Sequence, residues 1–133
     1  FSNIKIISTN INKSGNDCID LSYGNYSLND VFLSNCKDKA ISIGEKSNLK
    51  AELVNIVDSN SGIYSKDDSF VHVNKIIANR INKCLTAKNK KQEFYGSMLI
   101  VNNLECKNYE VKYDVDINSK IEIKKFVGQK REG

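Results

Sequence analysis

The segment "GNDCIDLS", residues 15–22, places a Cys-Ile-x-Leu run directly after a Gly-Asn-Asp turn. Similar short patterns, in which a small residue is followed by apolar, polar and apolar residues, recur along the chain. Counting onward from Cys18 of this segment in steps of about 22 residues reaches Ala40, Gly62, Cys84 and Cys106. Self-similarity at a fixed period of this length indicates a stacked repeat architecture, because each repeat buries its apolar face only against a neighbouring repeat.

Other positions follow the same period, and we call each set of residues aligned by it a column. The aligned sets are Ile19, Ile41, Ile63 and Leu85; Leu21, Ile43, Ser65 and Ala87; Phe32, Val54, Ile76 and Met98; and Asn16, Asp38, Asn60 and Asn82. Each repeat has room for three short strands separated by turns rich in Asn, Asp, Ser, Gly and Lys. The Leu and Asn spacing of leucine-rich repeats is missing, and so are the apolar residues at a spacing of about 3.6 residues that helical repeats require.

These patterns predict an all-β chain, a right-handed single-stranded parallel β-helix of four to five coils with about 22 residues per coil. The right hand follows from the general preference of parallel crossover connections. We expect the column that contains Ile19 and Ile41 to form a continuous interior stack. The absence of Pro suits internal strands, which must donate backbone N–H groups to their neighbours. Asn tolerates left-handed backbone, so the column that contains Asn16 is expected to form a ladder along one corner.

The four cysteines form no C-x-x-C pair and no Cys/His cluster at metal-ligand spacing. Cys84 and Cys106 fall in one column, where stacked side chains lie a strand spacing of ~4.8 Å apart. This exceeds the ~3.8 Å between the Cβ atoms of a disulfide. We therefore expect four free thiols, no metal site and no cofactor.

We expect one β-helix domain over residues 1–133. Because the sequence begins within a strand-like stretch, this domain is predicted to be the C-terminal part of a longer protein, preceded by further coils or another domain. Residues 107–133 are predicted to form an irregular closing coil and a charged tail, whose lysines would discourage pairing at the edge. No apolar run is long enough to span a membrane, and no secretory signal segment is present.

The net charge is +4, but the basic residues are spread through predicted turns. Nucleic-acid binding favours clustered basic residues with interleaved aromatic ones. The nearest approach is "KNKKQEFYG", residues 88–96, which we interpret as a solvated turn before a strand. The sequence therefore predicts no nucleic-acid partner.

The segments "GNDCIDLS", "KDKAISIGEKSNLK", "NSGIYSKDDS" and "NKKQEF" resemble right-handed parallel β-helix repeat proteins, the pectin-lyase-like superfamily, and in particular β-helix modules of exported bacterial and phage proteins. The resemblance covers nearly the whole chain. It implies an extracellular, cell-surface or virion location. It leaves the activity open, because this fold hosts lyases, hydrolases, epimerases, tailspikes and modules without known activity.

The catalytic motifs that the resemblance would imply are missing. The single histidine, His72, lies outside any Gly-His-Gly motif, and Arg80 has no acidic neighbours in the sequence. Asp20 could pair with Glu45 or Asp17 as the two carboxyl groups of a glycosidase, although the sequence does not indicate that geometry. The acidic run "KDD", residues 66–68, could hold a cation, but a solvated turn is the favoured interpretation.

Two functions therefore remain. The favoured one is a non-catalytic module that offers a rigid surface for saccharide binding or for assembly. The alternative is part of a polysaccharide-active enzyme, a lyase, hydrolase or epimerase, with catalytic residues partly outside this chain. The candidate carbohydrate-binding residues occupy outward positions of successive coils, where rings can stack on sugars and carboxylates can accept their hydroxyls. They are Asp20, Tyr23, Ser42, Glu45, Tyr64 and Asp67.

Overall fold

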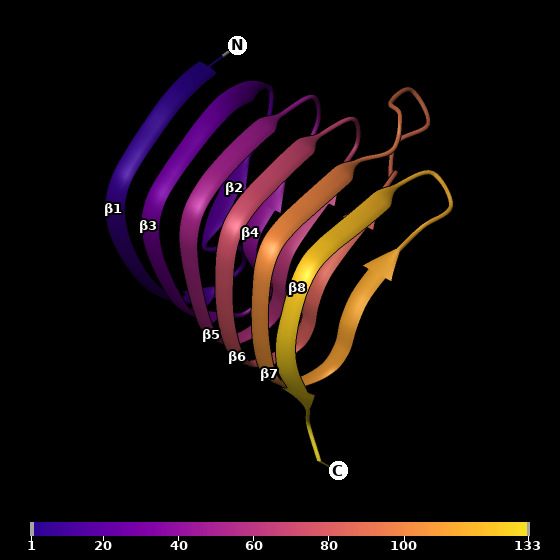
Figure 1. Ribbon diagram of the computed structural model, residues 1–133. Coiled ribbons are helices and arrows are strands. Elements are labelled where there is room, and N and C mark those ends of the chain that lie inside the picture. The colour runs from indigo at the N-terminus through magenta and orange to yellow at the C-terminus, as the bar shows by residue number, and fades with distance from the viewer. Residues whose placement is uncertain (1, 133) are drawn as a thin grey trace.

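The computed structural model describes residues 2–132 and folds them into one parallel sheet wound into a solenoid (Figure 1). Six strands follow one another along its axis in the order β1-β3-β5-β6-β7-β8, while β2 pairs with β4 and β4 with β5. The strands are β1 (Ser2–Gly15), β2 (Ile19–Leu21), β3 (Gly24–Cys36), β4 (Lys39–Ile43), β5 (Asn48–Lys66), β6 (Phe70–Lys88), β7 (Met98–Val115) and β8 (Lys120–Lys130). The predicted parallel β-solenoid is confirmed, with about six turns in place of four to five.

Each full coil has two limbs joined by a bend. In β5 the first limb, 48–57, pairs with β3, and the second limb, 61–66, pairs with β4. The bend lies at Asp58, which has a φ of 55°, and Asn35, Arg80 and Asn108 repeat this left-handed backbone on other coils. Asn and Asp accept left-handed backbone more readily than most residues. Three of these four corner positions therefore carry Asn or Asp, and Arg80 is the exception.

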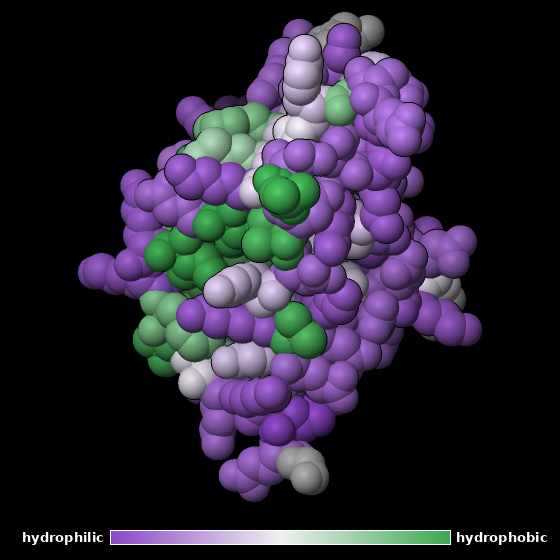
Figure 2. Space-filling view, turned by 90° about the vertical axis from the view of Figure 1, so that its right-hand side faces the viewer, coloured by the Kyte–Doolittle hydropathy of each residue, from purple (hydrophilic) through white to green (hydrophobic). Residues whose placement is uncertain are grey.

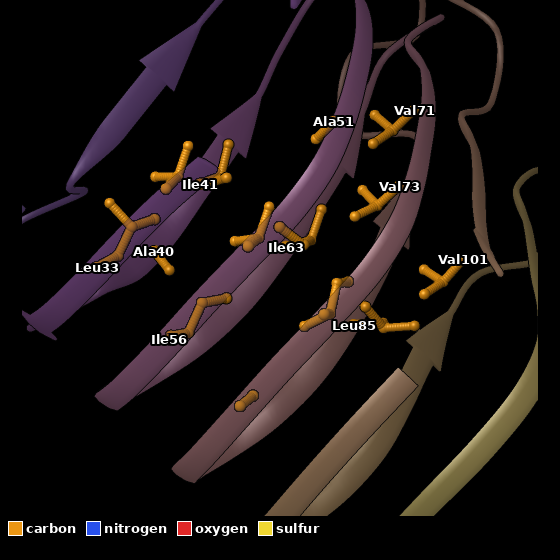
Figure 3. Packing of buried hydrophobic residues seen from close by; sticks show 14 of the residues in the cluster. Leu33, Ala40, Ile41, Ala51, Ile56, Ile63, Val71, Val73, Leu85 and Val101 are labelled. Carbon is orange, nitrogen blue, oxygen red and sulfur yellow. The ribbon is translucent and has the colours of Figure 1, made fainter. Parts of the chain in front are cut away.

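The predicted interior column is confirmed. Ile19, Ile41, Ile63 and Leu85 are register partners on successive coils, and all four are buried. Figure 3 shows the last three side by side, with Leu33 and Ile56 from the first limb beside them. The stack repeats one apolar shape at each coil, so each side chain packs against its equivalents above and below.

The Asn column is confirmed in part. The Nδ2 of Asn82 donates a hydrogen bond to the Oδ1 of Asn60 at 2.7 Å, as in a side-chain ladder. The backbone N–H of Asp38 donates to the backbone oxygen of Asn16 at 3.3 Å. The carboxylate of Asp38 accepts a hydrogen bond from Lys39 at 2.8 Å and not from the side chain of a stacked Asn.

The predicted column of Phe32, Val54, Ile76 and Met98 is wrong at two of its four positions. Phe32 pairs with Asn55 and not with Val54, because the register between β3 and β5 is displaced by one position from the period. Met98 pairs with Phe70 and not with Ile76, because residues 89–97 form a loop between β6 and β7 and lengthen that coil. Val54 and Ile76, between the two irregularities, are partners as predicted.

Within residues 107–132 lie the end of β7, all of β8 and the loop between them. The regular period returns here, since Met98 pairs with Lys120. Within the described residues no further strand covers β8 or the second limb of β7. Tyr113, Val115 and Val127 are therefore exposed at this end. Figure 2, which faces the side of the molecule where β8 lies, shows hydrophobic residues at the surface among hydrophilic ones.

The prediction of four free thiols is wrong, because the cysteines form the bonds Cys18–Cys36 and Cys84–Cys106. The longer coil before β7 places Cys106 beside Ala78 in the first limb, not above Cys84 in the second. Each bond thus joins the second limb of one coil to the first limb of the next, with Cα atoms 5.4 and 6.6 Å apart. The strand spacing limits only the distance between residues stacked within one column, and neither bond joins such a pair.

We expect reduction of the disulfides to destabilise the fold. The bonds close segments with sequence separations of 18 and 22 residues, and closure of loops of this length contributes about 3 kcal/mol each. Urea unfolding with and without a reductant should show a loss of this order per bond. Mass spectrometry of the unreduced, digested protein should recover both linked peptides, whereas titration of four free thiols in the denatured protein would contradict the pairing.

Candidate functional site

A hollow lies on the outer side of the second limbs, where four coils meet. Its volume is about 600 Å³. The floor and walls come from β4, β5, β6 and β7, with Asp38 from the turn before β4 and Lys90 from the loop 89–97. The hollow therefore crosses the coils. It is lined by Asp38, Lys39, Asn60, Ser61, Tyr64, Lys66, Asn82, Lys83, Lys90, Glu110 and Val111. We call it the Tyr64 groove.

Tyr64 lies in the middle of a cross-strand row. Its register partners are Ser42 on β4 and Thr86 on β6, and Asp20 and Asp114 continue the row at its ends. The Nζ of Lys39 lies 5.1 Å from the centroid of the Tyr64 ring, and the Nζ of Lys90 lies 5.9 Å from it. An ammonium group at this distance from a ring is attracted by the negative face of its π-system.

Lys39 is held in place by carboxylates. Its Nζ lies 2.8 Å from Asp38 and 3.9 Å from Asp17. Burial lowers the pKa of Lys39, but the hydrogen bond to Asp38 and the charges of Asp17 and Asp38 together raise it by more, so that the pKa lies above its ordinary value. This ammonium therefore stays protonated throughout the physiological pH range.

Asp114 joins two further lysines at the groove's edge. Its carboxylate accepts hydrogen bonds from Lys83 at 2.7 Å and from Lys88 at 2.8 Å. The hydrogen bonds from Lys83 and Lys88 lower the pKa of Asp114 below its usual range. The hydrogen bond to Asp114 raises the pKa of Lys88 by more than burial lowers it. The three groups form a small charged network with one excess positive charge.

Lys66 and Lys90 differ from these lysines. Both line the Tyr64 groove, and neither has a carboxylate partner within the part of the chain that the structure describes. Their charges are therefore available to an anionic group that enters the groove. Four lysines and two acidic residues line the groove, which leaves it positively charged.

The six residues predicted for saccharide binding fall into two groups. Asp20, Ser42 and Tyr64 share the cross-strand row, but Ser42 is fully buried and offers no surface. Tyr23, Glu45 and Asp67 lie beside the loop 89–97: Tyr23 packs edge-on against Phe94 with ring centroids 6.5 Å apart, and Glu45 binds Lys91 at 3.4 Å. Asp67 is fully buried, and its Oδ1 accepts two backbone N–H groups of this loop. Of the six, the Tyr64 groove includes Tyr64 alone.

Sequence reasoning missed the lysines of the groove. Lys39 and Lys83 share a column with Ser61 between them, and Lys66 and Lys88 are direct register partners. The period that aligned the apolar residues also aligns these charges, so extending the columns to Lys would have found them. Lys90 had no such signal, because the loop that carries it interrupts the period.

Other candidate chemistry lies apart from the groove. His72 shares a hydrogen bond of 3.1 Å between its Nε2 and the Oδ1 of Asn102, and it lines a different hollow with Lys50 and Glu52. Across residues 2–132, no group of three or more His, Cys, Asp or Glu side chains is placed to hold a metal ion. Among the same residues, no helix is long and apolar enough to cross a membrane.

Fold and site together define a parallel β-solenoid with a positively charged groove around one tyrosine. No protein-family model, no curated protein and no solved structure matched this chain.

The Asp114 network predicts a pH-dependent contribution to stability. Because the folded-state pKa of Asp114 is lowered, its stabilisation is fully present above the unfolded value of about 4 and is lost as pH falls through the folded pKa. Asp114→Asn should therefore lower the melting temperature at pH 7, and this deficit should be smaller near pH 2. Asp30→Asn, at an exposed strand position, is the matched control. An equal deficit for Asp114→Asn at both pH values would show that the ion pairs do not contribute.

Proposed function

We propose that this chain is a non-catalytic, right-handed β-helix module of the pectin-lyase-like kind, which binds saccharide in the Tyr64 groove. One observation carries the proposal: a tyrosine ring lies in a groove that crosses the coils, with ammonium groups of two lysines near it. An aromatic ring can pack against the apolar face of a sugar while charged and amide groups bind its hydroxyls. The coils repeat every ~4.8 Å, so an extended chain could follow the groove.

The rigidity of the groove supports a binding role. Its walls are strands whose backbone groups pair with neighbouring coils, and the row that contains Tyr64 alternates with the buried column of Ile41, Ile63 and Leu85. A preformed site loses little conformational freedom when a ligand binds. The same stiffness would suit the assembly role, in which the module holds its neighbours at a fixed spacing.

The disulfides support an exported location. Two disulfides in a chain of 133 residues are typical of proteins that fold in an oxidising environment. This agrees with the resemblance to exported bacterial and phage modules and with a surface or virion location.

The carboxyl groups with shifted pKa values do not suit catalysis. Asp58 and Asp114 have lowered pKa values because arginine or lysine donates hydrogen bonds to them. For Asp116, burial raises the pKa, but hydrogen bonds from Asn89, Ser119 and Asn118 together lower it by more. A general acid in glycoside hydrolysis needs a raised pKa, so none of these three suits that role. The module proposal is therefore preferred to the polysaccharide-active enzyme.

The test is a glycan-array screen of the purified chain with acidic and neutral polysaccharides, followed by titration calorimetry on any hit. Tyr64→Ala should weaken binding about fivefold or more, since it removes an aromatic contact worth ~1 kcal/mol or more. Tyr95→Ala, an exposed tyrosine outside the groove, is the matched control.

Binding that survives Tyr64→Ala would place the site elsewhere on the module. Release of shortened or unsaturated sugars from any polysaccharide in the screen would support the enzyme instead. If nothing is bound and nothing is cleaved, the saccharide proposal is wrong and the assembly role gains support.

A further inference from the structure

The loop 89–97 gathers oxygen atoms around one side chain. The Nδ2 of Asn89 lies 2.9 Å from the backbone oxygen of Phe94, 3.1 Å from that of Tyr95 and 3.2 Å from that of Lys91. The Oδ1 of Asp67 is a fourth neighbour at 3.4 Å. A carboxamide nitrogen carries only two hydrogens, so at most two of these four oxygens can receive a well-directed hydrogen bond from it.

Asp67 adds a charge that is incompletely compensated. It is fully buried, and its Oδ1 accepts backbone N–H groups of Lys90 at 2.6 Å and Lys91 at 2.9 Å. Its Oδ2 is buried without any hydrogen-bond partner, and no ion pair involves Asp67 within residues 2–132. A buried carboxylate without a cationic partner is costly, and such groups usually pair with a cation or coordinate a metal.

A second carboxylate lies on the other side of Asn89. The Oδ2 of Asp116 accepts the backbone N–H of Asn89 at 2.7 Å, while the Oδ1 of Asp116 is buried without a partner. Asn89 is thus placed between two aspartates that each retain one buried, unpaired oxygen.

An oxygen atom in the place of the Nδ2 of Asn89 would have the spacing of a calcium shell. Ligand oxygens at about 2.3–2.6 Å from Ca²⁺ lie roughly 3 Å from their neighbours in the coordination shell, and the Nδ2 of Asn89 lies 2.9 to 3.4 Å from the four oxygens around it. Turning the amide of Asn89 by half a turn would put Oδ1 at this position as a fifth oxygen and would give up the 3.5 Å hydrogen bond that Oδ1 now accepts from the Nδ2 of Asn118. Backbone carbonyls with carboxylate and amide oxygens, without nitrogen or sulfur ligands, are typical of Ca²⁺ and not of Zn²⁺.

We propose that the loop 89–97 binds one Ca²⁺ ion through Asp67, the Oδ1 of Asn89 and the backbone oxygens of Lys91, Phe94 and Tyr95. In the calcium-free protein the Nδ2 of Asn89 lies where its Oδ1 would lie in the bound form, and it donates to two of the same oxygens. The site is separate from the Tyr64 groove, but the loop also carries Lys90, whose ammonium faces Tyr64. Calcium would therefore order one wall of the groove.

The experiment is calcium titration of the full chain after dialysis against EDTA, followed by calorimetry and by melting with CaCl₂ or EDTA. We expect one Ca²⁺ per chain and a melting temperature that rises with calcium, because a ligand bound only by the folded state stabilises it. Asp67→Asn should abolish both effects, since it removes the buried charge but keeps an oxygen for the two backbone N–H groups. Asp68→Asn, at the exposed neighbouring carboxylate, is the matched control and should change neither.

Asn89→Asp separates a calcium site from a purely structural role. Without calcium this carboxylate would face Asp67 and three carbonyl oxygens, so the melting temperature in EDTA should fall. With calcium it would be an additional charged ligand, so the melting temperature should recover and the affinity for Ca²⁺ should rise. Absence of calcium binding by the native chain, or an equal loss of stability by Asn89→Asp in EDTA and in CaCl₂, would overturn the proposal.

Discussion

The structure depends on one constraint: parallel strands must pair their backbone groups at a fixed register, coil after coil. Once β5 and β6 are paired over both limbs, each paired residue of β5 lies against its equivalent on the next coil. Parallel pairing at ~4.8 Å leaves no room for an unpaired buried N–H or C=O group. The chain meets this constraint by using no proline and by returning to similar residues at each turn. Stacked Ile, Val and Leu then give the core, and stacked Asn and Asp the corner.

The loop 89–97 is the principal departure from this regularity, and several features follow from it. By lengthening one coil it shifts the register between β6 and β7 and places Cys106 where it can bond with Cys84. It also lies over the second limb, where it contributes Lys90 to the Tyr64 groove and covers Asp67. Gly96 permits this close approach, because a Cβ there would overlap the backbone oxygen of Asn118. One insertion thus supplies a disulfide, a groove wall and the oxygen-lined nest around Asn89.

Sequence reasoning identified the part of the fold that repeats and failed where the repeat is interrupted. The column of Ile19, Ile41, Ile63 and Leu85 could be predicted because the period is unbroken across it. The position of Met98 could not, since a change in loop length shifts the register without altering the local pattern. The prediction of four free thiols is wrong for a related reason. Contacts between the two limbs depend on how the corner bends, and the alignment of residues by period gives no information about that bend. Of the predicted binding residues, Ser42 and Asp67 proved to be buried, because an outward direction in a strand does not guarantee exposure beneath neighbouring side chains and an added loop.

The central claim is that one register holds the coils around the Tyr64 groove together and is interrupted at the loop 89–97. Solution NMR of the backbone tests it most directly, through contacts between protons of Cα and amide groups on adjacent parallel strands. The structure predicts contacts between Ile63 and Leu85 on β5 and β6, and between Ile76 and Leu104 on β6 and β7. Contacts between Ile76 and Met98, as an uninterrupted period would require, would contradict it.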